Sequence, residues 1–285
     1  MFSVRGKIKM RHLKFTIFAL ILALPALDYA QIRRNRRPDL STNQTRTFFP
    51  FRKKLTKEQK KQLEPKAEDS AKYAQFLAQP NTGIFRLLPD NDCEENAFVI
   101  KADASCLKSI PEGSFYSFRE KEHTSETVAD IRLKNGFLIS DGILAQGILV
   151  KLEDSALERI SLKSEGLNYL RDYQPPESSE KAHEQHIKLL RGIKVDKYEY
   201  RKAFSAVENT TYAMRVIAYR GKIIRSLNGY NYNILDGDKR MDLTLAFRVI
   251  RKEPDGSVTL LWKELEQRDS PKLKFTKNNK SKNEE

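Results

Sequence analysis

The chain has 285 residues, and its 52 lysines and arginines against 38 aspartates and glutamates give a formal charge of +14. This length allows one large domain or two modest ones, and 15 phenylalanines and 11 tyrosines can furnish a core, which excludes a wholly disordered chain. Two cysteines exclude a disulfide-dense small scaffold and a zinc site built from four cysteines.

The first 30 residues have the pattern of an export signal. Five bases and no acid occupy residues 1–14, and residues 15–27 form an uncharged, mostly apolar run of 13 residues. As a helix this run covers only about 20 Å, less than the roughly 30 Å of bilayer hydrocarbon. We therefore predict an extracytoplasmic protein, periplasmic or secreted. Because neither Ala26 nor Ala30 completes a small-x-small cleavage site, an N-terminal anchor held in the membrane by residues 15–27 is the alternative.

The positive charge is concentrated near the two ends of the chain. Residues 31–61 hold eleven bases and two acids, residues 271–285 hold five lysines and two glutamates, and residues 62–270 carry a net charge of −2. Composition predicts a disordered basic arm over 31–54 and a disordered basic tail over 271–285. Residues 31–61 are a candidate contact for an anionic membrane surface, whereas an exported location argues against nucleic acid as the partner. The folded body is expected to have no basic face.

The body, residues 55–270, begins with two helical patterns. Thr56 can cap a helix over 57–64, and alanines at helical spacing predict one continuous helix over 67–78. Short apolar runs between turn residues then predict strands over 84–88, 97–101 and 114–119. His123 follows in a polar stretch and is expected in a loop.

The middle of the body combines a hairpin, a strand and a helix. Asn135-Gly136 between apolar residues predicts a β-hairpin within 128–140, and residues 142–152 predict a further strand. Residues 155–172 fit a strand or a helical turn equally well. Pro175-Pro176 interrupts the chain, so a division into two subdomains near residue 175 is the alternative to a single domain. Ser178 or Ser179 can then cap a helix that runs to Arg191 and ends at Gly192.

The last third has the clearest strand patterns. Residues 197–207 alternate, with Tyr198, Tyr200, Phe204 and Ala206 predicted on one face. Residues 242–263 predict a hairpin that turns at 254–256, a Pro-Asp-Gly sequence. Many strands with few intervening helices predict a β-rich α+β fold, mainly antiparallel sheet arranged as a sandwich or an open barrel, with two or three short helices.

Export also determines how Cys93 and Cys106 are interpreted. In an oxidising compartment a lone pair of cysteines is most simply one disulfide, which here closes a loop of 14 residues. Two buried or free thiols are the alternative. The acidic neighbours of Cys93 argue against a reactive thiolate.

Two pairs of side chains are candidates for a metal site. His183 and His186 are three residues apart and therefore neighbours on a helix, but they lack the four-residue spacing of zinc hydrolases. Asp236 and Asp238 flank a glycine without the register of a calcium loop. An amphipathic helix and an ordinary turn explain the two pairs equally well, so we expect no metal. We also expect no cofactor, since neither a phosphate-binding glycine loop nor a dinucleotide fingerprint occurs.

Tyrosines beside arginines give the remaining suggestion of function. Tyr198, Tyr200, Arg215 and Tyr219 are candidates for a binding surface, and a β core covered by arginine stems is the alternative. The sequence contains no recognisable catalytic constellation. We therefore interpret the protein as an exported β-rich binding or structural module of unknown ligand. The alternatives are an extracytoplasmic hydrolase without a recognisable motif and a membrane-anchored accessory protein.

Overall fold

A computed structural model of the chain describes residues 55–90, 94–96, 99–100, 110, 112–140, 142–227 and 230–275. These residues form mainly antiparallel sheets with short helices, which confirms the predicted β-rich α+β fold. The predicted export signal over 1–30, the predicted basic arm over 31–54, Cys93, Cys106 and tail residues 276–285 lie outside the described residues.

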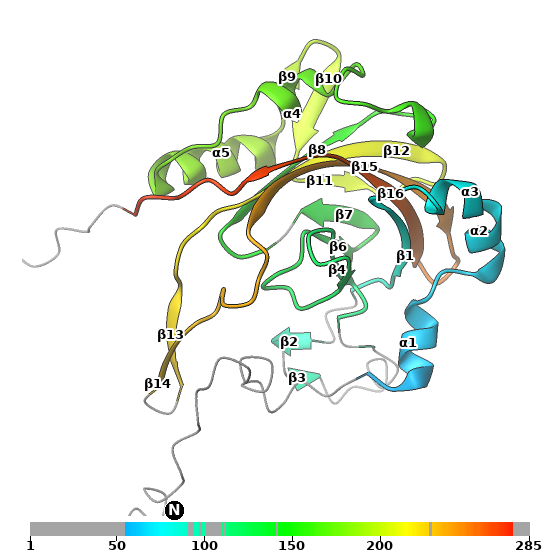
Figure 1. Cartoon of the computed structure of the whole chain (residues 1–285), viewed down its shortest axis with the longest axis horizontal. Coiled ribbons are helices and arrows are strands. Elements are labelled where there is room, and N and C mark those ends of the chain that lie inside the picture. Colours follow the sequence, from blue (N-terminus) through cyan, green and yellow to red (C-terminus); the bar gives the residue numbers. More distant parts are fainter. Residues whose placement is uncertain are drawn as a thin grey trace, which may run out of the picture. The chain divides into compact units, whose positions relative to one another are not determined.

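A curved seven-stranded antiparallel sheet forms the centre of the body (Figure 1). Its spatial order is β1-β16-β15-β12-β8-β10-β9. In chain order the strands are β1 (Thr82–Leu87), β8 (Ala145–Lys151), β9 (Ile193–Val195), β10 (Tyr198–Arg201), β12 (Thr210–Ala218), β15 (Met241–Lys252) and β16 (Val258–Asp269). Strands β8 and β10 pair directly, so one sheet contains strands from both sides of Pro175-Pro176.

A five-stranded sheet, in the order β11-β7-β6-β4-β5, lies against the concave face of the large sheet (Figure 1). Its strands are β4 (Phe115–Ser117), β5 (Glu122–His123), β6 (Ile131–Lys134), β7 (Phe137–Ser140) and β11 (Ala203–Ser205). Two further hairpins form separate two-stranded sheets: β2 (Glu94–Asn96) with β3 (Val99–Ile100), and β13 (Ile224–Leu227) with β14 (Tyr230–Asn233).

The two larger sheets are joined at both sides. On one side β7 continues into β8 and β10 continues into β11, and the amide of Ser140 donates to the carbonyl of Lys202 at 2.8 Å. On the other side the chain leaving β1 reaches the small sheet, where the amide of Asp90 donates to the carbonyl of Leu133 at 2.9 Å. The arrangement is therefore intermediate between a sandwich and an open barrel.

Between the two sheets lies a core rich in aromatic side chains. The Phe85 and Tyr116 rings stack at 3.6 Å, and Trp262 packs edge-on against Phe118. The residues predicted to alternate on β15 and β16 all contribute to this core: Leu243, Leu245, Phe247, Val249, Val258, Leu260 and Trp262. The hairpin predicted over 242–263 is confirmed, because these residues occupy consecutive paired strands.

The convex face of the large sheet is buried as well. It packs under the 3₁₀ turn η3 (Leu157–Arg159), α4 (Asn168–Asp172), α5 (Ser179–Arg191) and α3 (Ala74–Leu77), which follows α2 (Ala67–Lys72). A second apolar cluster fills this layer and contains Leu157, Leu170 and Leu189 together with Ile148 and Val150 of β8. The central strands are therefore covered on both sides.

Helix ends follow their sequence signals. Helix α1 (Lys57–Leu63) begins with a capping box, in which Thr56 and Gln59 exchange side chain–backbone hydrogen bonds. Ser178 caps α5, and Gly192 ends it with a φ of +94°. The single helix predicted over 67–78 is instead two helices, because Tyr73 leaves the helical region (φ −103°, ψ 17°) and separates α2 from α3.

Residues 155–172, for which a strand and a helical turn were both open, form η3 and α4, in agreement with the helical alternative. Two other predictions differ from the structure. His123 lies in β5, where its Nδ1 is 3.0 Å from the carbonyl oxygen of Phe115, and not in a loop. Tyr198 and Tyr200 pack in the outer layer whereas Phe204 and Ala206 pack between the sheets, because the chain changes sheets at Lys202.

Candidate functional site

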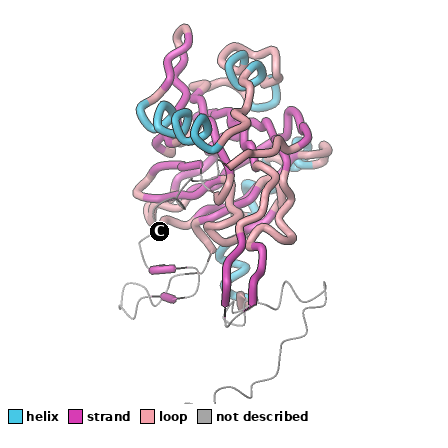
Figure 2. Tube along the Cα trace, turned by 90° about the vertical axis from the view of Figure 1, so that its left-hand side faces the viewer, coloured by secondary structure: helices cyan, strands magenta, loops and turns pink. Residues whose placement is uncertain are grey.

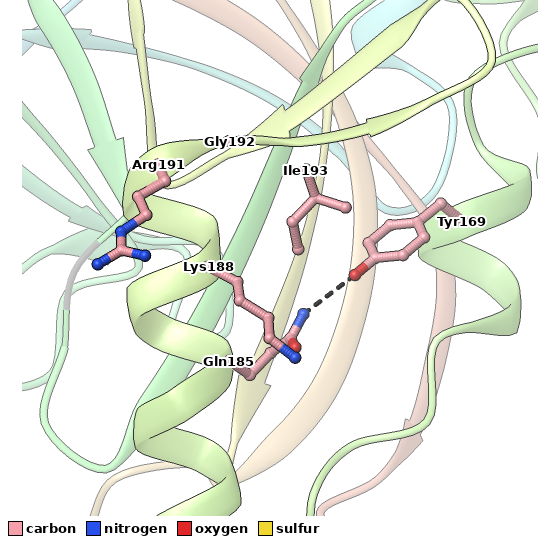
Figure 3. Close-up of a pocket in the computed structure, with 6 residues that line it drawn as sticks. All are labelled: Tyr169, Gln185, Lys188, Arg191, Gly192 and Ile193. Atoms are coloured by element: carbon pink, nitrogen blue, oxygen red, sulfur yellow. Dashed lines mark hydrogen bonds between the residues drawn. The ribbon is translucent and has the colours of Figure 1, made fainter.

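A groove of about 430 Å³ opens on the outer layer, between α4, α5 and β9. It is shallow and open to solvent, and its lining is Tyr169, Gln185, Lys188, Arg191, Gly192 and Ile193 (Figure 3). Figure 3 shows the side chains of Lys188 and Gln185 reaching toward Tyr169, with Ile193 beside them. The Arg191 guanidinium points away from Tyr169, so the groove itself presents one cation.

The sequence of α5 explains how these side chains reach the groove. Leu189 is buried against the sheet, so Gln185 and Lys188, one turn apart on the helix, lie at the side of the helix that faces α4. Gly192 then reverses the chain into β9 and brings Ile193 over the groove. The atoms nearest to a Cβ at Gly192 belong to the flexible side chains of Glu199 and Arg201, which can move, so the turn needs glycine for its positive φ of +94°.

Tyr169 is held in place from two sides. Gln185 Nε2 donates to the Tyr169 hydroxyl at 3.0 Å, and the ring packs against Tyr200 with centroids 4.5 Å apart. Partial burial raises the pKa of the Tyr169 phenol, so the hydroxyl stays protonated at neutral pH. Because the hydroxyl oxygen accepts from Gln185, its own proton can be donated to a bound group.

The charge beside the Tyr169–Gln185 pair is positive. Lys188 is exposed, and among the described residues it is paired with no carboxylate. Arg201, on the neighbouring strand, is instead paired with Glu199 at 3.3 Å. Lys188 and Arg191 also lie in the last turn of α5, where cations stabilise the helix dipole. The groove therefore offers an ammonium group, a phenol and an apolar wall, which is a donor-rich lining suited to an anionic group.

The two candidate histidines lie on the same helix but do not line the groove. Their rings are parallel with centroids 6.4 Å apart; His183 is exposed and His186 is half-buried. His186 Nδ1 lies 3.4 Å from Lys202 Nζ, and burial, followed by the Lys202 charge, lowers the pKa of His186. Within the part of the chain that the structure describes, no group of three or more metal-ligating side chains converges.

The two candidate aspartates have separate partners. Asp236 is exposed and accepts from Asn233 Nδ2 at 2.7 Å. The side chain of Asp238 is 1% exposed and pairs with Arg119 and Arg240, each with an N–O distance of 2.5 Å. Arg119 also pairs with Asp130 at 2.7 Å, so Asp238 belongs to a buried network of two arginines and two aspartates.

Three of the four candidate binding residues are buried. The Tyr200 hydroxyl donates to the carbonyl of Gly166 at 2.8 Å, and the Tyr219 hydroxyl donates to Gln146 Oε1 at 3.1 Å. Arg215 is buried with Asp242. Tyr198 is half-buried, and its ring lies under the Lys197 ammonium group. These side chains are therefore parts of the outer core, and Tyr200 contributes to the groove only by supporting Tyr169.

None of the groove residues was predicted from the sequence. Gln185 and Lys188 share a helix face, which is a visible signal, but Tyr169 comes from another element 16 residues earlier. The groove depends on how α4 and α5 pack, and no spacing in the sequence encodes that.

Searches of protein-family models, curated proteins and solved structures find no match to this chain. No helix among the described residues has the length and apolar character needed to span a bilayer.

Proposed function

We propose that the protein is an exported binding module that holds a small anionic ligand in the groove between α4, α5 and β9. The observation that carries this proposal is the Lys188 ammonium beside the Tyr169–Gln185 pair in a groove of about 430 Å³. Such a volume falls within the range of small-molecule sites, and its open shape suits exchange of a ligand with solvent.

The experiment is calorimetric titration with three probes: inorganic phosphate, citrate and an acidic peptide. Lys188→Gln should weaken binding of the preferred probe severalfold, because it removes the charge and keeps most of the side-chain volume. Tyr169→Phe should weaken it less. Lys194→Gln, on the exposed side of β9 and outside the groove, is the matched control and should bind as the parent does. Equal affinities in Lys188→Gln and the parent for all three probes contradict the proposal.

The exported location is part of the proposal and is supported by the basic segment followed by the apolar run at residues 15–27. N-terminal sequencing of the protein from the extracytoplasmic fraction should find residues 1–30 removed. Met1 retained on a membrane-bound protein would instead support the anchored accessory protein.

An exported chain is also expected to carry a disulfide between Cys93 and Cys106. Alkylation of the unreduced, denatured protein should then modify neither cysteine, and alkylation after reduction should modify both. Two modified thiols before reduction contradict the disulfide.

We further propose that the basic segment 31–61 contacts an anionic membrane surface. Its net charge of +9 supports this partner. Deleting residues 31–54 should weaken binding to anionic vesicles and leave the unfolding midpoint of the body unchanged.

A further inference from the structure

A local concentration of positive charge lies where β12 leaves the large sheet, although residues 62–270 have a net charge of −2. Arg220, Lys222 and Arg225 follow one another toward and along β13, and Lys272 pairs with Arg220 through a β-bridge. All four side chains are exposed, and within the described residues none is paired with a carboxylate. The expectation that the body has no basic face is therefore wrong at this place.

The β13–β14 hairpin carries part of this charge away from the rest of the body. It forms a two-stranded sheet of its own, and it projects at the lower end of the body in both views (Figures 1 and 2). Ile224, between Lys222 and Arg225, is 55% exposed. A two-stranded hairpin without a covering layer is marginally stable in water, so an interface that covers Ile224 would stabilise it.

We propose that the β13–β14 hairpin docks on an anionic membrane surface. Because neighbouring side chains of a strand point to opposite faces, the hairpin meets the bilayer along the outer edge of β13. In this orientation Ile224 enters the interfacial region and Lys222 and Arg225 contact lipid phosphates, while Arg220 and Lys272 add attraction at the root of the hairpin. The exposed isoleucine favours a bilayer over a soluble polyanion, because a polyanion attracts the cations but does not bury the Ile224 side chain.

Two further features of the chain support a membrane as the binding partner of the hairpin. Helix α1, which follows the basic arm directly, lies toward the same end of the body as the hairpin in both views, and its Lys57, Lys60 and Lys61 are exposed. Helix α5 and strand β9 lie at the opposite end (Figures 1 and 2). A body docked through the hairpin would therefore leave the groove open to solvent. The docking does not depend on the ligand proposed for that groove.

The test is co-sedimentation of the mature chain, residues 31–285, with vesicles of phosphatidylcholine alone or mixed with phosphatidylglycerol. Each cation near an anionic surface contributes roughly fivefold in affinity at low salt, so Lys222→Gln with Arg225→Gln should weaken binding by about 25-fold. Ile224→Ser should weaken binding to the same vesicles with the charge unchanged. Arg159→Gln with Lys163→Gln is the matched control, since both side chains are exposed, carry the same charge and lie far from the hairpin in sequence. The basic arm is the same in every variant, so the ratio of affinities isolates the hairpin.

Three outcomes overturn the proposal. In the first, the hairpin double variant binds phosphatidylglycerol vesicles as tightly as the parent. In the second, the control double variant loses as much affinity as the hairpin variant, which assigns the effect to net charge. In the third, Ile224→Ser binds as the parent does while heparin competes fully, which assigns the surface to a soluble polyanion. Circular dichroism of each variant checks that a loss of binding does not come from unfolding.

Discussion

Arg215 and Asp242 form a bidentate ion pair inside the outer layer, with Nε 2.8 Å from Oδ1 and Nη2 2.6 Å from Oδ2. The remaining Arg215 nitrogen, Nη1, donates to the carbonyls of Leu170 and Tyr173 at 2.6 and 2.8 Å. One guanidinium therefore ties β12 and β15 to the end of α4. Because Tyr169 lies on α4, this pair also helps to position one wall of the groove.

Removing the Asp242 carboxylate should destabilise the fold strongly. Asp242→Ala leaves the Arg215 charge buried without its counterion, which costs roughly 3–5 kcal/mol of unfolding free energy. The measurement is urea unfolding followed by tryptophan fluorescence. Replacing both partners, as Arg215→Met with Asp242→Leu, should restore part of this loss, since no charge is then stranded.

The exposed pair Lys197–Glu165, at 2.5 Å, is the matched control for this prediction. Its side chains are 69% and 76% exposed, so water and salt screen the interaction and Glu165→Ala should shift the unfolding midpoint far less. An Asp242→Ala midpoint equal to that of Glu165→Ala would show that the buried pair does not hold the layer together.

His123 should make stability depend on pH. Burial beside the Phe85 and Tyr116 rings lowers the pKa of His123 below its ordinary value near 6.5. The folded state therefore holds the neutral ring, while the unfolded chain takes up a proton as the pH falls through about 6.5. The stability contributed by His123 is complete above the unfolded pKa and is lost as the pH falls from there through the folded pKa.

His123→Phe should reduce this loss of stability, measured as the difference in urea midpoint between about pH 7.5 and about pH 5.5. Half-buried His186, whose pKa is also lowered, should account for part of the difference in urea midpoint that remains in His123→Phe. If the difference in urea midpoint is as large in His123→Phe as in the parent chain, the assignment of this pH dependence to His123 is contradicted.

Asp238 should behave as a structural residue. Its carboxylate is shared by Arg119 and Arg240, so Asp238→Asn should lower the unfolding free energy by roughly 3 kcal/mol. Asp236→Asn, at the exposed end of the same turn, should have a smaller effect. Neither calcium nor a chelator should move the parent's Tm. A calcium-dependent rise in Tm that is lost in Asp238→Asn would make this carboxylate a ligand instead.

Local signals in the sequence predict the helix ends and hairpins, because their causes lie within a few residues. Thr56 with Gln59, Ser178, Gly192 and the Asn135-Gly136 turn, whose φ values are +52° and +74°, all act in this way. Period-two alternation also predicts the strand at 197–207 but not its change of sheet at Lys202, since Ser140 on another strand determines that corner. The groove could not be predicted from the sequence either, because the position of α4 depends on hydrogen bonds from Arg215 to carbonyls 42–45 residues away along the chain.

Strands β7 and β8 approach each other closely where they join the two sheets, so this place should accept no additional side-chain atom at Gly147. A Cβ atom there would lie 2.3 Å from Ser140 Cβ and 2.6 Å from Ser140 Oγ. Gly147→Ala must therefore displace β7 from β8, and overpacking of this kind costs roughly 1–3 kcal/mol. Ser140→Gly removes both clashing atoms, so the double variant should recover much of the lost stability.

A double-mutant cycle by urea unfolding tests this contact, because neighbouring sites that share a clash are not additive. The control is Gly136→Ala, in an exposed turn where a Cβ atom would meet nothing within 4 Å. Its cost, about 1 kcal/mol, comes from the positive φ alone, so Ser140→Gly should not rescue it. If the changes in unfolding free energy for Gly147→Ala and Ser140→Gly are additive, the added Cβ atom is accommodated without contact with Ser140. This result would contradict the close approach of β7 and β8.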